Sequence, residues 1–453
     1  MQTEFHIGVD DTDSRLGGCT TYTAALLFQE LVTKGFEPID FPWLVRLNPN
    51  IPWKTRGNGA LSLHFMLEEE QLQEVKKIAV AAVERATDLS QRSTDPAVVF
   101  LKGLVPSPLG EFSIRALHDV LSVREARHLA DAIGVETHLL KGSRGLVGAL
   151  ASVGANFSRD HTFEIIAYRT PESIGTIRRV NLDSVRRMDA MFHGLTFNNV
   201  DPETGRVLIC PHGPDPVLLG VRGEDPASLA KAFNQIEIDE PIERVMIFKT
   251  NQGTDAHLSC RRRIETLEPH QSAVITGRVS DAPRMLRGGH VIFRTDDGTG
   301  SVDCAAYDAT GSLRQTALQL VPGDSVTVSG GIRSRPLGGL TLNVEKLEVT
   351  GLVDTVRFEN PCCSSCGARC ESMGKGQGFR CKKCKTRLLN TSRVQTQIHR
   401  KISLGVYLPP PRTNRHLTKP ASRNGINHPT FFETGTANID RNLESLISIS
   451  IAS

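Results

Sequence analysis

Three aspartates stand close together near the start of the chain, in the stretch GVDDTDSRLGGCTTY. The carboxylates of Asp10, Asp11 and Asp13 would repel one another, and a hard cation with oxygen ligands, such as Mg²⁺, relieves that repulsion. A calcium-binding EF-hand is excluded, because Tyr22 stands where that loop needs a bidentate glutamate. Aspartate, serine, threonine and glycine also favour turns and helix N-caps, so the loop by itself leaves metal binding and ordinary capping open.

The residues around this acidic loop favour a phosphate ligand. Two glycines and the run Cys-Thr-Thr precede a helical pattern, and backbone N–H groups at a helix start attract anions. A second stretch, WKTRGNGA, combines two cations with two glycines, which let a phosphate approach closely. Carboxylates that hold a metal beside a helix start predict a phosphoryl-transfer centre, with the hydroxyl of Thr20 within reach. The residues that we expect to contact a nucleotide are Gly17, Gly18, Thr21, Lys54 and Arg56.

Two further loops carry charged residues beside glycines. The stretches PHGPDPVLLGVRGE (211–224) and NQGTDAHL (251–258) place His, Asp, Arg and Glu side chains at the ends of expected strands. One such loop is usually only a turn. Several of them on one chain predict that they share a cleft.

Four of the ten cysteines form two CxxC pairs, Cys363 with Cys366 and Cys381 with Cys384. Two thiolate pairs at this spacing predict a tetrahedral zinc site of the ribbon type. Four thiolates leave no open coordination position, so we assign the zinc to folding rather than to catalysis. Cys362 directly precedes the first pair and could take the first ligand place instead. The mixture of clustered and scattered cysteines suits a reducing cytoplasm better than a disulfide framework.

A strand and a helix position the acidic loop. Phe5, Ile7 and Val9 alternate as in a strand, and the apolar residues of AALLFQEL repeat with helical spacing. Alternating strands and helices continue to about residue 160, with clear helices around 68–86 and 123–133. Between about 163 and 263, a strand–helix–strand pattern with short connections predicts a small ferredoxin-like α+β domain.

The second half of the chain has a different pattern. Residues 273–349 contain alternating runs broken by Gly and Asp turns, with one helical stretch at 310–320. Five short strands and one helix are typical of an OB-type barrel, whose strand face often binds nucleic acid. The segment 372–432 then holds thirteen Lys or Arg residues and no Asp or Glu. Such a block predicts a polyanionic partner, and we favour nucleic acid over a merely solvated tail.

The whole chain has 453 residues and a net charge of +3, and this length allows three or four domains. No apolar run approaches the roughly 18 residues that a membrane helix needs, and an acidic pair stands where a signal peptide would be apolar. We therefore expect a cytoplasmic protein without a membrane partner.

Taken in order, these motifs resemble the archaeal agmatinylcytidine synthetases of isoleucine tRNA, the TiaS family. The resemblance rests on GVDDTDS with GCTTY, TRGNGA, PHGPDPVLLGVRGE, TNQGTDAHL, VSGGIR, the double CxxC and RHLTKP. It implies a multidomain α+β protein. The expected parts are an α/β kinase-like domain (1–160), a ferredoxin-like domain (162–265), an OB-fold β-barrel (270–352), a zinc ribbon with a basic tail (358–430) and a mobile extension (431–453).

The activity implied by this resemblance joins agmatine to carbon 2 of the wobble cytidine in an isoleucine tRNA with a CAU anticodon. ATP is consumed to AMP and two phosphates, and the modified tRNA reads AUA. The carbonyl oxygen of cytidine leaves poorly, but once phosphorylated it leaves as phosphate and the agmatine amine can displace it. The resemblance thus implies ATP, Mg²⁺ and Zn²⁺ as cofactors. It implies tRNA and agmatine as substrates and no protein partner.

The resemblance also implies roles for single residues. Asp10, Asp11 and Asp13 match the acidic metal-binding loop, and Thr20 matches a threonine that can itself be phosphorylated. Agmatine is a dication, so its pocket should contain carboxylates, and a histidine there could accept the proton of the attacking amine. The residues that we expect in this pocket, from their type and motif, are Asp215, Glu224, Asp255 and His257. The barrel and ribbon would hold the tRNA body, and the basic tail would follow its phosphates.

Two other interpretations fit the same residues. The barrel and ribbon could form a nucleic-acid-binding scaffold without catalysis, in which the acidic loop only caps a helix. An ATP-dependent RNA kinase would transfer phosphate and stop there. Two features depart from the family pattern, namely the doubled Cys362–Cys363 and the polar extension after residue 430.

Overall fold

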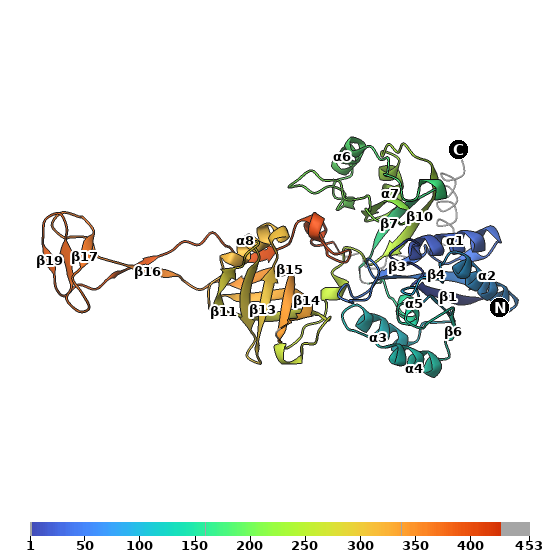
Figure 1. The fold of residues 1–453 in the computed structure, drawn as a ribbon, viewed down its shortest axis with the longest axis horizontal. Coiled ribbons are helices and arrows are strands. Elements are labelled where there is room, and N and C mark those ends of the chain that lie inside the picture. The colour runs from blue at the N-terminus through green and yellow to red at the C-terminus, as the bar shows by residue number, and fades with distance from the viewer. Residues whose placement is uncertain (1, 159, 337, 427–453) are drawn as a thin grey trace.

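A computed structural model describes residues 2–158, 160–336 and 338–426. The molecule is elongated, with a body of two lobes at one end, a barrel in the middle and a small ribbon domain that stands away on two strands (Figure 1). The extension expected after residue 430 lies outside the described residues. No helix in the described part of the chain has the length and apolar character needed to cross a membrane.

The first lobe is a three-layer α/β structure. Its strands are β1 (Thr3–Asp10), β2 (Glu37–Pro38), β3 (Trp43–Arg46), β4 (Gly59–Leu67), β5 (Ala97–Lys102) and β6 (Glu136–Leu139). Its helices are α1 (Thr20–Thr33), α2 (Leu72–Arg85), α3 (Ser107–Ala116), α4 (Val123–Ile133) and α5 (Gly145–Val153). The predicted helix at 123–133 is confirmed as α4. The helix predicted at 68–86 is α2 preceded by one 3₁₀ turn (Glu69–Gln71).

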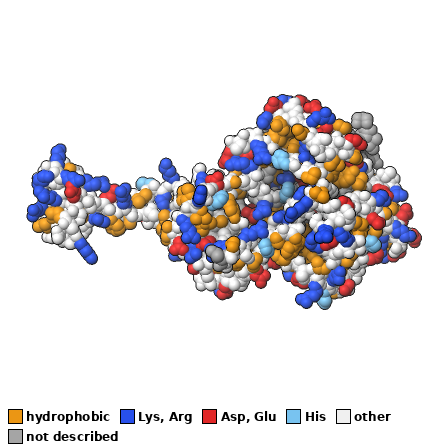
Figure 2. Space-filling model, viewed as in Figure 1, with side chains coloured by type: hydrophobic (Ala, Val, Ile, Leu, Met, Phe, Trp, Pro, Cys, Tyr) orange, Lys and Arg blue, Asp and Glu red, His pale blue; other side chains and the backbone are white. Residues whose placement is uncertain are grey.

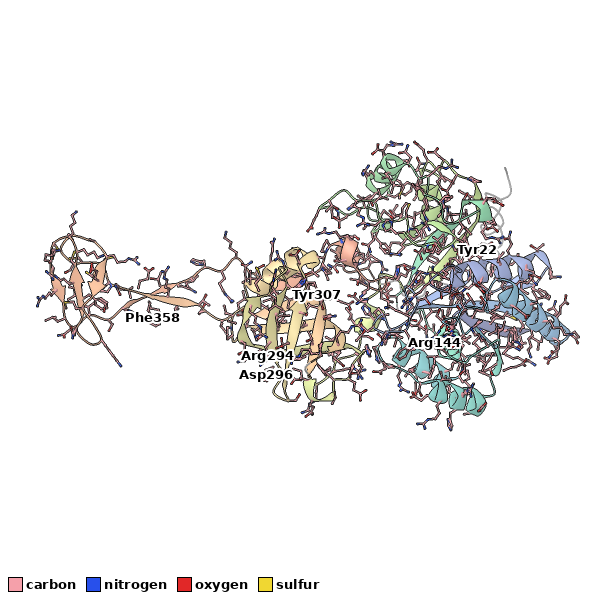
Figure 3. All side chains as sticks on the ribbon, in the orientation of Figure 1. Tyr22, Arg144, Arg294, Asp296, Tyr307 and Phe358 are labelled. Atoms are coloured by element: carbon pink, nitrogen blue, oxygen red, sulfur yellow. The ribbon has the colours of Figure 1, made fainter. Side chains whose placement is uncertain are left out.

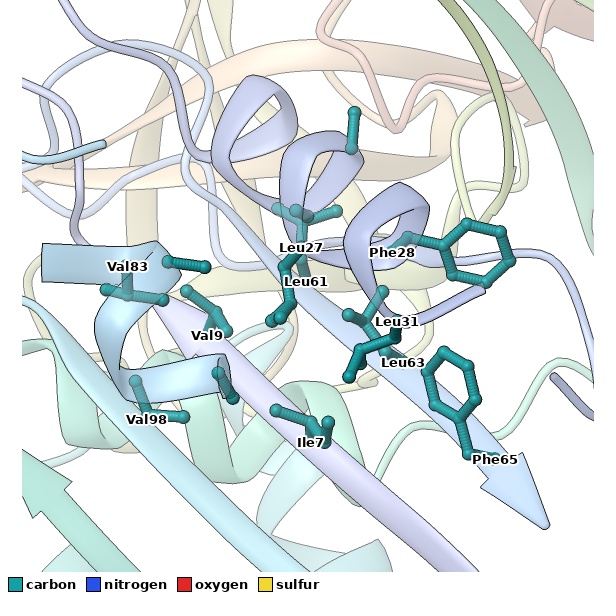
Figure 4. Packing of buried hydrophobic residues seen from close by; sticks show 14 of the residues in the cluster. Ile7, Val9, Leu27, Phe28, Leu31, Leu61, Leu63, Phe65, Val83 and Val98 are labelled. Atoms are coloured by element: carbon teal, nitrogen blue, oxygen red, sulfur yellow. The ribbon is translucent and has the colours of Figure 1, made fainter. Parts of the chain in front are cut away.

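Alternating side chains of the strands build two cores, one on each face of the sheet. On one face Ile7 and Val9 of β1 pack with α1 and α2, and Figure 4 shows Leu27 and Phe28 of α1 above Leu61 of β4. The other face packs against α3, α4 and α5. The alternation in the sequence therefore places the acidic loop at the point where β1 leaves the sheet and α1 begins.

The second lobe is an α+β unit whose strands continue the same sheet. Its strands are β7 (Thr162–Arg169), β8 (Thr196–Phe197), β9 (Val217–Gly223) and β10 (Ile242–Thr250), and its helices are α6 (Leu182–Met191) and α7 (Pro226–Phe233). The sheet order is β6-β5-β1-β4-β3-β10-β7-β9-β8, with β2 on β4. The junction is a parallel pairing of β3 with β10, at Trp43 with Lys249 and Leu44 with Thr250. The two lobes are thus joined by one continuous sheet.

The barrel confirms the predicted five strands and one helix. They are β11 (Ser272–Met285), β12 (Val291–Asp296), β13 (Ser301–Ala306), α8 (Ser312–Leu318), β14 (Ser325–Ser334) and β15 (Leu340–Gly351). Parallel pairing of β13 with β15 closes the barrel around a core of buried aliphatic side chains. A short strand from later in the chain, β21 (Gly405–Tyr407), adds to β15 as an outer strand.

The ribbon stands on a pair of antiparallel strands, β16 (Val356–Glu359) and β20 (Val394–Gln397). It contains three short strands, β17 (Cys370–Ser372), β18 (Phe379–Cys381) and β19 (Arg387–Leu388). Seven basic side chains between residues 375 and 393 are exposed on it, and Figure 2 shows Lys and Arg over its surface. This distribution agrees with the predicted polyanionic partner.

After the ribbon, the chain turns back to the two-lobed body. We call residues 405–426 the return segment. Three cations of the predicted basic tail, Arg412, Lys419 and Arg423, form ion pairs with aspartates or glutamates of the body. That the rest of the tail follows tRNA phosphates stays a prediction.

Candidate functional site

A cavity of about 920 Å³ lies between the two lobes. One wall comes from the end of β1, the start of α1, β3 and the loop 53–59, and the opposite wall comes from β7 and β9. Residues within the segments 116–123, 142–148 and 197–211 and one residue near the end of the described chain, His416, also line it. Figure 2 shows Lys, Arg and His side chains around the hollow between the lobes. The cavity therefore collects the acidic loop, the stretch 53–59 and part of 211–224, which are far apart in the sequence, whereas the predicted loop 251–258 does not line it.

Asp10 lies at the end of β1 and lines this cavity. Burial raises the pKa of Asp10 well above its usual range, and the nearby charge of Asp11 raises it further. Helix α5 approaches so closely that a Cβ added to Gly148 would lie 1.9 Å from Asp10 Oδ2. Among the described residues, no Lys or Arg forms an ion pair with Asp10. Its carboxylate is thus the member of the acidic loop best placed to gain from a bound cation.

Asp11 and Asp13 each have an arginine partner. Arg144 donates two hydrogen bonds to Asp11 Oδ2, from Nη2 at 2.8 Å and Nε at 3.0 Å, and Figure 3 shows it at the centre of the two-lobed body. Arg56 Nη2 donates to Asp13 Oδ2 at 2.8 Å. Burial raises the pKa of Asp11 to about 6 against the opposing effect of Arg144. Burial also raises the pKa of Asp13, which Arg56 opposes.

Thr20 and Thr21 form the first turn of α1, and both line the cavity. The N-cap of this helix is Cys19, whose side chain accepts no capping hydrogen bond, and the first turn contains no acidic residue. The aspartates of the preceding loop therefore do not cap α1, which removes the capping interpretation left open by the sequence. The first-turn N–H groups face a cavity that could hold an anion.

The residues expected to contact a nucleotide divide into two groups. Thr21, Lys54 and Arg56 line the cavity. Burial lowers the pKa of Lys54, and the positive charges of Arg415 and Arg333 lower it further. Gly17 and Gly18 do not line the cavity, but the carbonyl of Gly18 accepts a hydrogen bond of 2.6 Å from Arg56. These two glycines shape the loop, because Gly18 has a φ of +76°, which disfavours other residues.

Of the four residues expected near agmatine, the structure brings one to the cavity. Asp215 lines it and lies 3.6 Å from Arg56 and 3.5 Å from Arg178.

The other three lie elsewhere. Glu224 pairs with Arg423, Asp255 pairs with Lys346, and the fully buried His257 lies 2.9 Å from Glu345. These three residues therefore contact the return segment or the barrel, where these parts pack against the second lobe.

Several cavity residues were missed by the sequence analysis. They are Arg46, Asp95, Arg144, Glu164, Arg222 and His416. Arg222 and His416 lie in motifs that the sequence analysis quoted, in VRGE and RHLTKP. Arg144 lies in a glycine-containing stretch, KGSRG, that offered the same signal as the other loops. Glu164 lies within the buried strand β7, where no motif or residue spacing marks it as a cavity residue.

The four predicted zinc ligands converge. Each of Cys363, Cys366, Cys381 and Cys384 offers one sulfur, and all four sulfurs lie within 4.8 Å of one another. Within the described part of the chain, this is the one group of three or more ligand side chains that converges in this way. The fit is that of a closed structural zinc site. Cys362 is exposed and lies outside the group, which favours Cys363 as the first ligand.

Comparisons with known protein families match four successive parts of the chain between residues 6 and 402. Residues 6–142 match the family described as the TiaS TCKD domain, and residues 143–257 match the TiaS FLD domain. Residues 273–350 match the OB-fold nucleic acid binding domain, and residues 360–402 match the TiaS C-terminal zinc ribbon domain. The four matches follow the order of the lobes, the barrel and the ribbon.

Similar proteins and structures cover nearly the whole chain. The isoleucine-tRNA 2-agmatinylcytidine synthetase TiaS of Pyrococcus horikoshii is 41% identical, over 92% of this chain and 96% of its own. The TiaS of Methanosarcina acetivorans is 41% identical, over 92% of this chain and 97% of its own. Among solved structures, the complex of TiaS with isoleucine tRNA and ATP has a TM-score of 0.84 at 38% identity, covering 93% of this chain and 97% of that one.

A second solved structure, the complex of TiaS with isoleucine tRNA, AMPCPP and agmatine, has a TM-score of 0.82 at 35% identity, over 94% of this chain and 98% of that one. Sequence identity, coverage and fold thus agree for both lobes, the barrel and the ribbon. The chain belongs to the TiaS family of isoleucine-tRNA 2-agmatinylcytidine synthetases.

Proposed function

We propose that this protein joins agmatine to carbon 2 of the wobble cytidine of an isoleucine tRNA with a CAU anticodon, with ATP and one water converted to AMP and two phosphates. Relatives matched over 92% of this chain carry the name of this activity. The observation that carries the proposal is the cavity between the lobes, which combines buried carboxylates, a helix start and several arginines. Because the product is a tRNA used in translation, we place the reaction in the cytoplasm.

The chemistry requires phosphate to be placed on a poor leaving group. In our proposal the first turn of α1 and the cationic side chains of Lys54 and Arg56 hold phosphoryl oxygens, whose charge they neutralise. Once the carbonyl oxygen carries phosphate, the agmatine amine attacks carbon 2 and phosphate departs. Thr20 lies at the same helix start and is our proposed site of phosphorylation of the enzyme itself.

The acidic loop fits a magnesium ion that is shared with a nucleotide. Three partly buried carboxyl groups with raised pKa values would be stabilised in the charged form by a cation. Magnesium usually takes one or two carboxylates together with substrate phosphates. We propose that Asp10 supplies the main ligand of the ion and that the charges of Asp11 and Asp13 adjust the electrostatic field at that position. The ion would neutralise charge on the transferred phosphoryl group.

Carboxylates in the cavity suit the two positive ends of agmatine. Asp215 and Glu164 are both buried in the wall formed by the second lobe. Asp95 lies in the first lobe, close enough to Asp11 to affect its pKa. We propose that agmatine lies between these walls, with Asp215 retained from the sequence prediction. Glu224, Asp255 and His257 are not carried forward as ligands.

The ribbon and barrel would hold the RNA. Exposed basic side chains cover the ribbon, and contacts between cations and phosphates supply much of the affinity for nucleic acids. The four thiolates would hold zinc and fold the ribbon, which has a very small apolar core of its own.

Mass spectrometry of the anticodon nucleosides tests the proposed function. The protein is incubated with the tRNA, ATP, Mg²⁺ and agmatine, and the RNA is digested. A cytidine heavier by agmatine less water supports the ligase. A cytidine that gains only phosphate identifies an RNA kinase, and bound but unchanged RNA identifies a scaffold. A reaction without agmatine is the matched control.

A further inference from the structure

The return segment brings a residue from beyond the ribbon into the cavity between the lobes. After β21 it crosses the second lobe, and His416 contributes to the cavity lining. The carbonyl oxygens of His416 and Leu417 accept hydrogen bonds from the backbone of Gly253 and Asp255, at 2.9 and 2.8 Å. This segment is therefore paired with the 251–255 loop at the point where it reaches the cavity.

Ion pairs hold the return segment on both sides of His416. Arg412 lies 3.0 Å from the fully buried Asp201. Arg423 is itself fully buried and pairs with Asp160 at 2.9 Å and Glu224 at 2.7 Å. Breaking a buried ion pair leaves an uncompensated charge, so these anchors strongly favour one position of the segment.

Hydrogen bonding fixes the tautomer of the imidazole of His416. Arg222 Nη2 lies 2.9 Å from His416 Nδ1, and an arginine can only donate. Nδ1 is therefore the acceptor, and the proton of the neutral ring lies on Nε2. Arg222 is oriented in turn by Glu164, which accepts from its Nε at 3.0 Å. Among the described residues, no group accepts a hydrogen bond from His416 Nε2.

Three arginines place positive charge around this imidazole, and Glu164 offsets part of it through its contacts with Arg222 and Arg46. Arg46 and Arg222 lie nearest, and together with burial they hold the pKa of His416 well below its usual range. Arg415 acts in the same direction. The Nε of Arg46 is buried and has no hydrogen-bond partner among the described residues. The neutral ring thus presents an N–H donor in a field that attracts an anion.

We propose that His416 donates a hydrogen bond from Nε2 to a phosphoryl oxygen of the substrate, together with Arg46 and Arg222. The inference rests on the proposed function and adds a substrate-binding residue that belongs to the return segment. The oxygen belongs either to the nucleotide or to the RNA, since both carry phosphate. The ring acts as a donor and not as a general base, because its acceptor nitrogen is occupied by Arg222.

Three substitutions test this role. H416F keeps a ring without a donor, and H416Q keeps an N–H donor at a similar distance from the backbone. H128A changes an exposed histidine on α4 and is the matched control. Single-turnover incorporation of agmatine is expected to fall about 10- to 100-fold in H416F, while H416Q stays within a few-fold of wild type. Thermal melting of each variant is compared with H128A to verify folding.

Binding measurements then identify the source of the phosphate. A loss of ATP affinity in H416F, measured without RNA, assigns the contact to the nucleotide. A loss of tRNA affinity, measured without ATP, assigns it to the RNA. Equal rates for H416F and wild type overturn the inference, as does equal impairment of H416Q and H416F, which would indicate a role of shape alone.

The two proposals can fail separately. A wild-type protein that binds ATP and tRNA but incorporates no agmatine contradicts the proposed function. In that case the affinities of H416F and H416Q still decide the inference. The inference is overturned if H416F binds ATP and tRNA as tightly as wild type and the control H128A do.

Discussion

Arg144 donates two hydrogen bonds to one carboxylate oxygen of Asp11, although the two residues are 133 positions apart in the sequence. Arg144 lies just before α5, and it also donates to the carbonyl of Ser93. Asp11 has a φ of +60°, an unfavourable value for a residue other than glycine. The ion pair therefore helps to hold the acidic loop in a strained shape, with Asp10 directed into the cavity.

Removal of the loop carboxylates should abolish the reaction and spare RNA binding. D11A and D13A are each expected to reduce agmatine incorporation by at least about 100-fold, because phosphoryl transfer depends on fixed charges at this position. Affinity for tRNA should stay near that of wild type, since the basic ribbon is far from the loop. The measurements are single-turnover incorporation and filter binding.

The matched control is D131A, which removes an exposed aspartate on α4. It should leave both quantities unchanged. A parallel loss of tRNA affinity in D11A would argue against separate catalytic and RNA-binding regions.

A single methyl group behind Asp10 should displace its carboxylate. In G148A the new Cβ would lie 1.9 Å from Asp10 Oδ2, so the aspartate must move. A shift of about 1 Å in a reacting group costs on the order of 100-fold in rate, and we expect a loss of that size. Activity and melting temperature are measured together, because a folded but inactive G148A is the expected outcome.

G110A is the control for this substitution. It places a methyl group in helix α3, where the nearest heavy atom is 3.9 Å away. Alanine is a better helix former than glycine, so G110A should be as stable as wild type or slightly more stable. Full activity in G148A would show that the position of Asp10 is unimportant.

The acidic loop, the zinc ligands and the barrel could be predicted because their signals are local. Cys363 and Cys366 are three positions apart, and the strand before Asp10 is marked by alternation within the five residues from Phe5 to Val9. The partners of these residues could not be predicted. Arg144 and Asp11 meet only because α5 packs on β1, which is a tertiary contact without local spacing.

The agmatine pocket shows the same limit. Asp215 and Glu224 belong to one motif and are both acidic, yet Asp215 lines the cavity and Glu224 pairs with Arg423. The path of the return segment decides between them, and nothing in the sequence of the motif indicates that path. The domain boundary near residue 160 remains a prediction. Helix α5 packs with the first lobe, although the family descriptions change at residue 142.

Two buried histidines should make the first lobe sensitive to acid. His6 Nδ1 and His64 Nδ1 are 2.7 Å apart, and His6 Nε2 lies 2.9 Å from the carbonyl of Gly103. His6 therefore donates a hydrogen bond from Nε2 to the carbonyl of Gly103. Its Nδ1 accepts the hydrogen bond that His64 donates from Nδ1. Burial lowers the pKa of both rings below the ordinary value of 6.5.

The sign of the pH effect follows from these lowered pKa values. Below pH 6.5 the unfolded chain binds protons that the folded rings do not, so the free energy of unfolding falls as pH falls. The slope is about 1.4 kcal/mol per pH unit for each histidine. H64Q removes one titrating group and keeps polar atoms, so its melting temperature should fall less between about pH 7.5 and 5 than that of wild type. H128Q, on the surface, should follow wild type, and equal slopes for H64Q and wild type would contradict the assignment.

Loss of zinc should unfold the ribbon and leave the two-lobed body intact. The buried core of the ribbon consists of three cysteines and Phe379, which is too little apolar surface to fold alone. C381S removes a fully buried ligand and should yield protein without bound zinc, measured by elemental analysis. Its tRNA affinity should fall and depend less on salt, because the exposed basic side chains of the ribbon are no longer presented together. ATP affinity and the main melting transition should match wild type.

C362S is the matched control for the loss of zinc. It changes an exposed cysteine outside the four-sulfur group, so this variant should keep its zinc and its tRNA affinity. Zinc loss in C362S would show that the thiol next to Cys363 takes part in metal binding. A lower melting temperature of the two-lobed body in C381S would show that the ribbon stabilises the two lobes, although the ribbon stands away from them on β16 and β20.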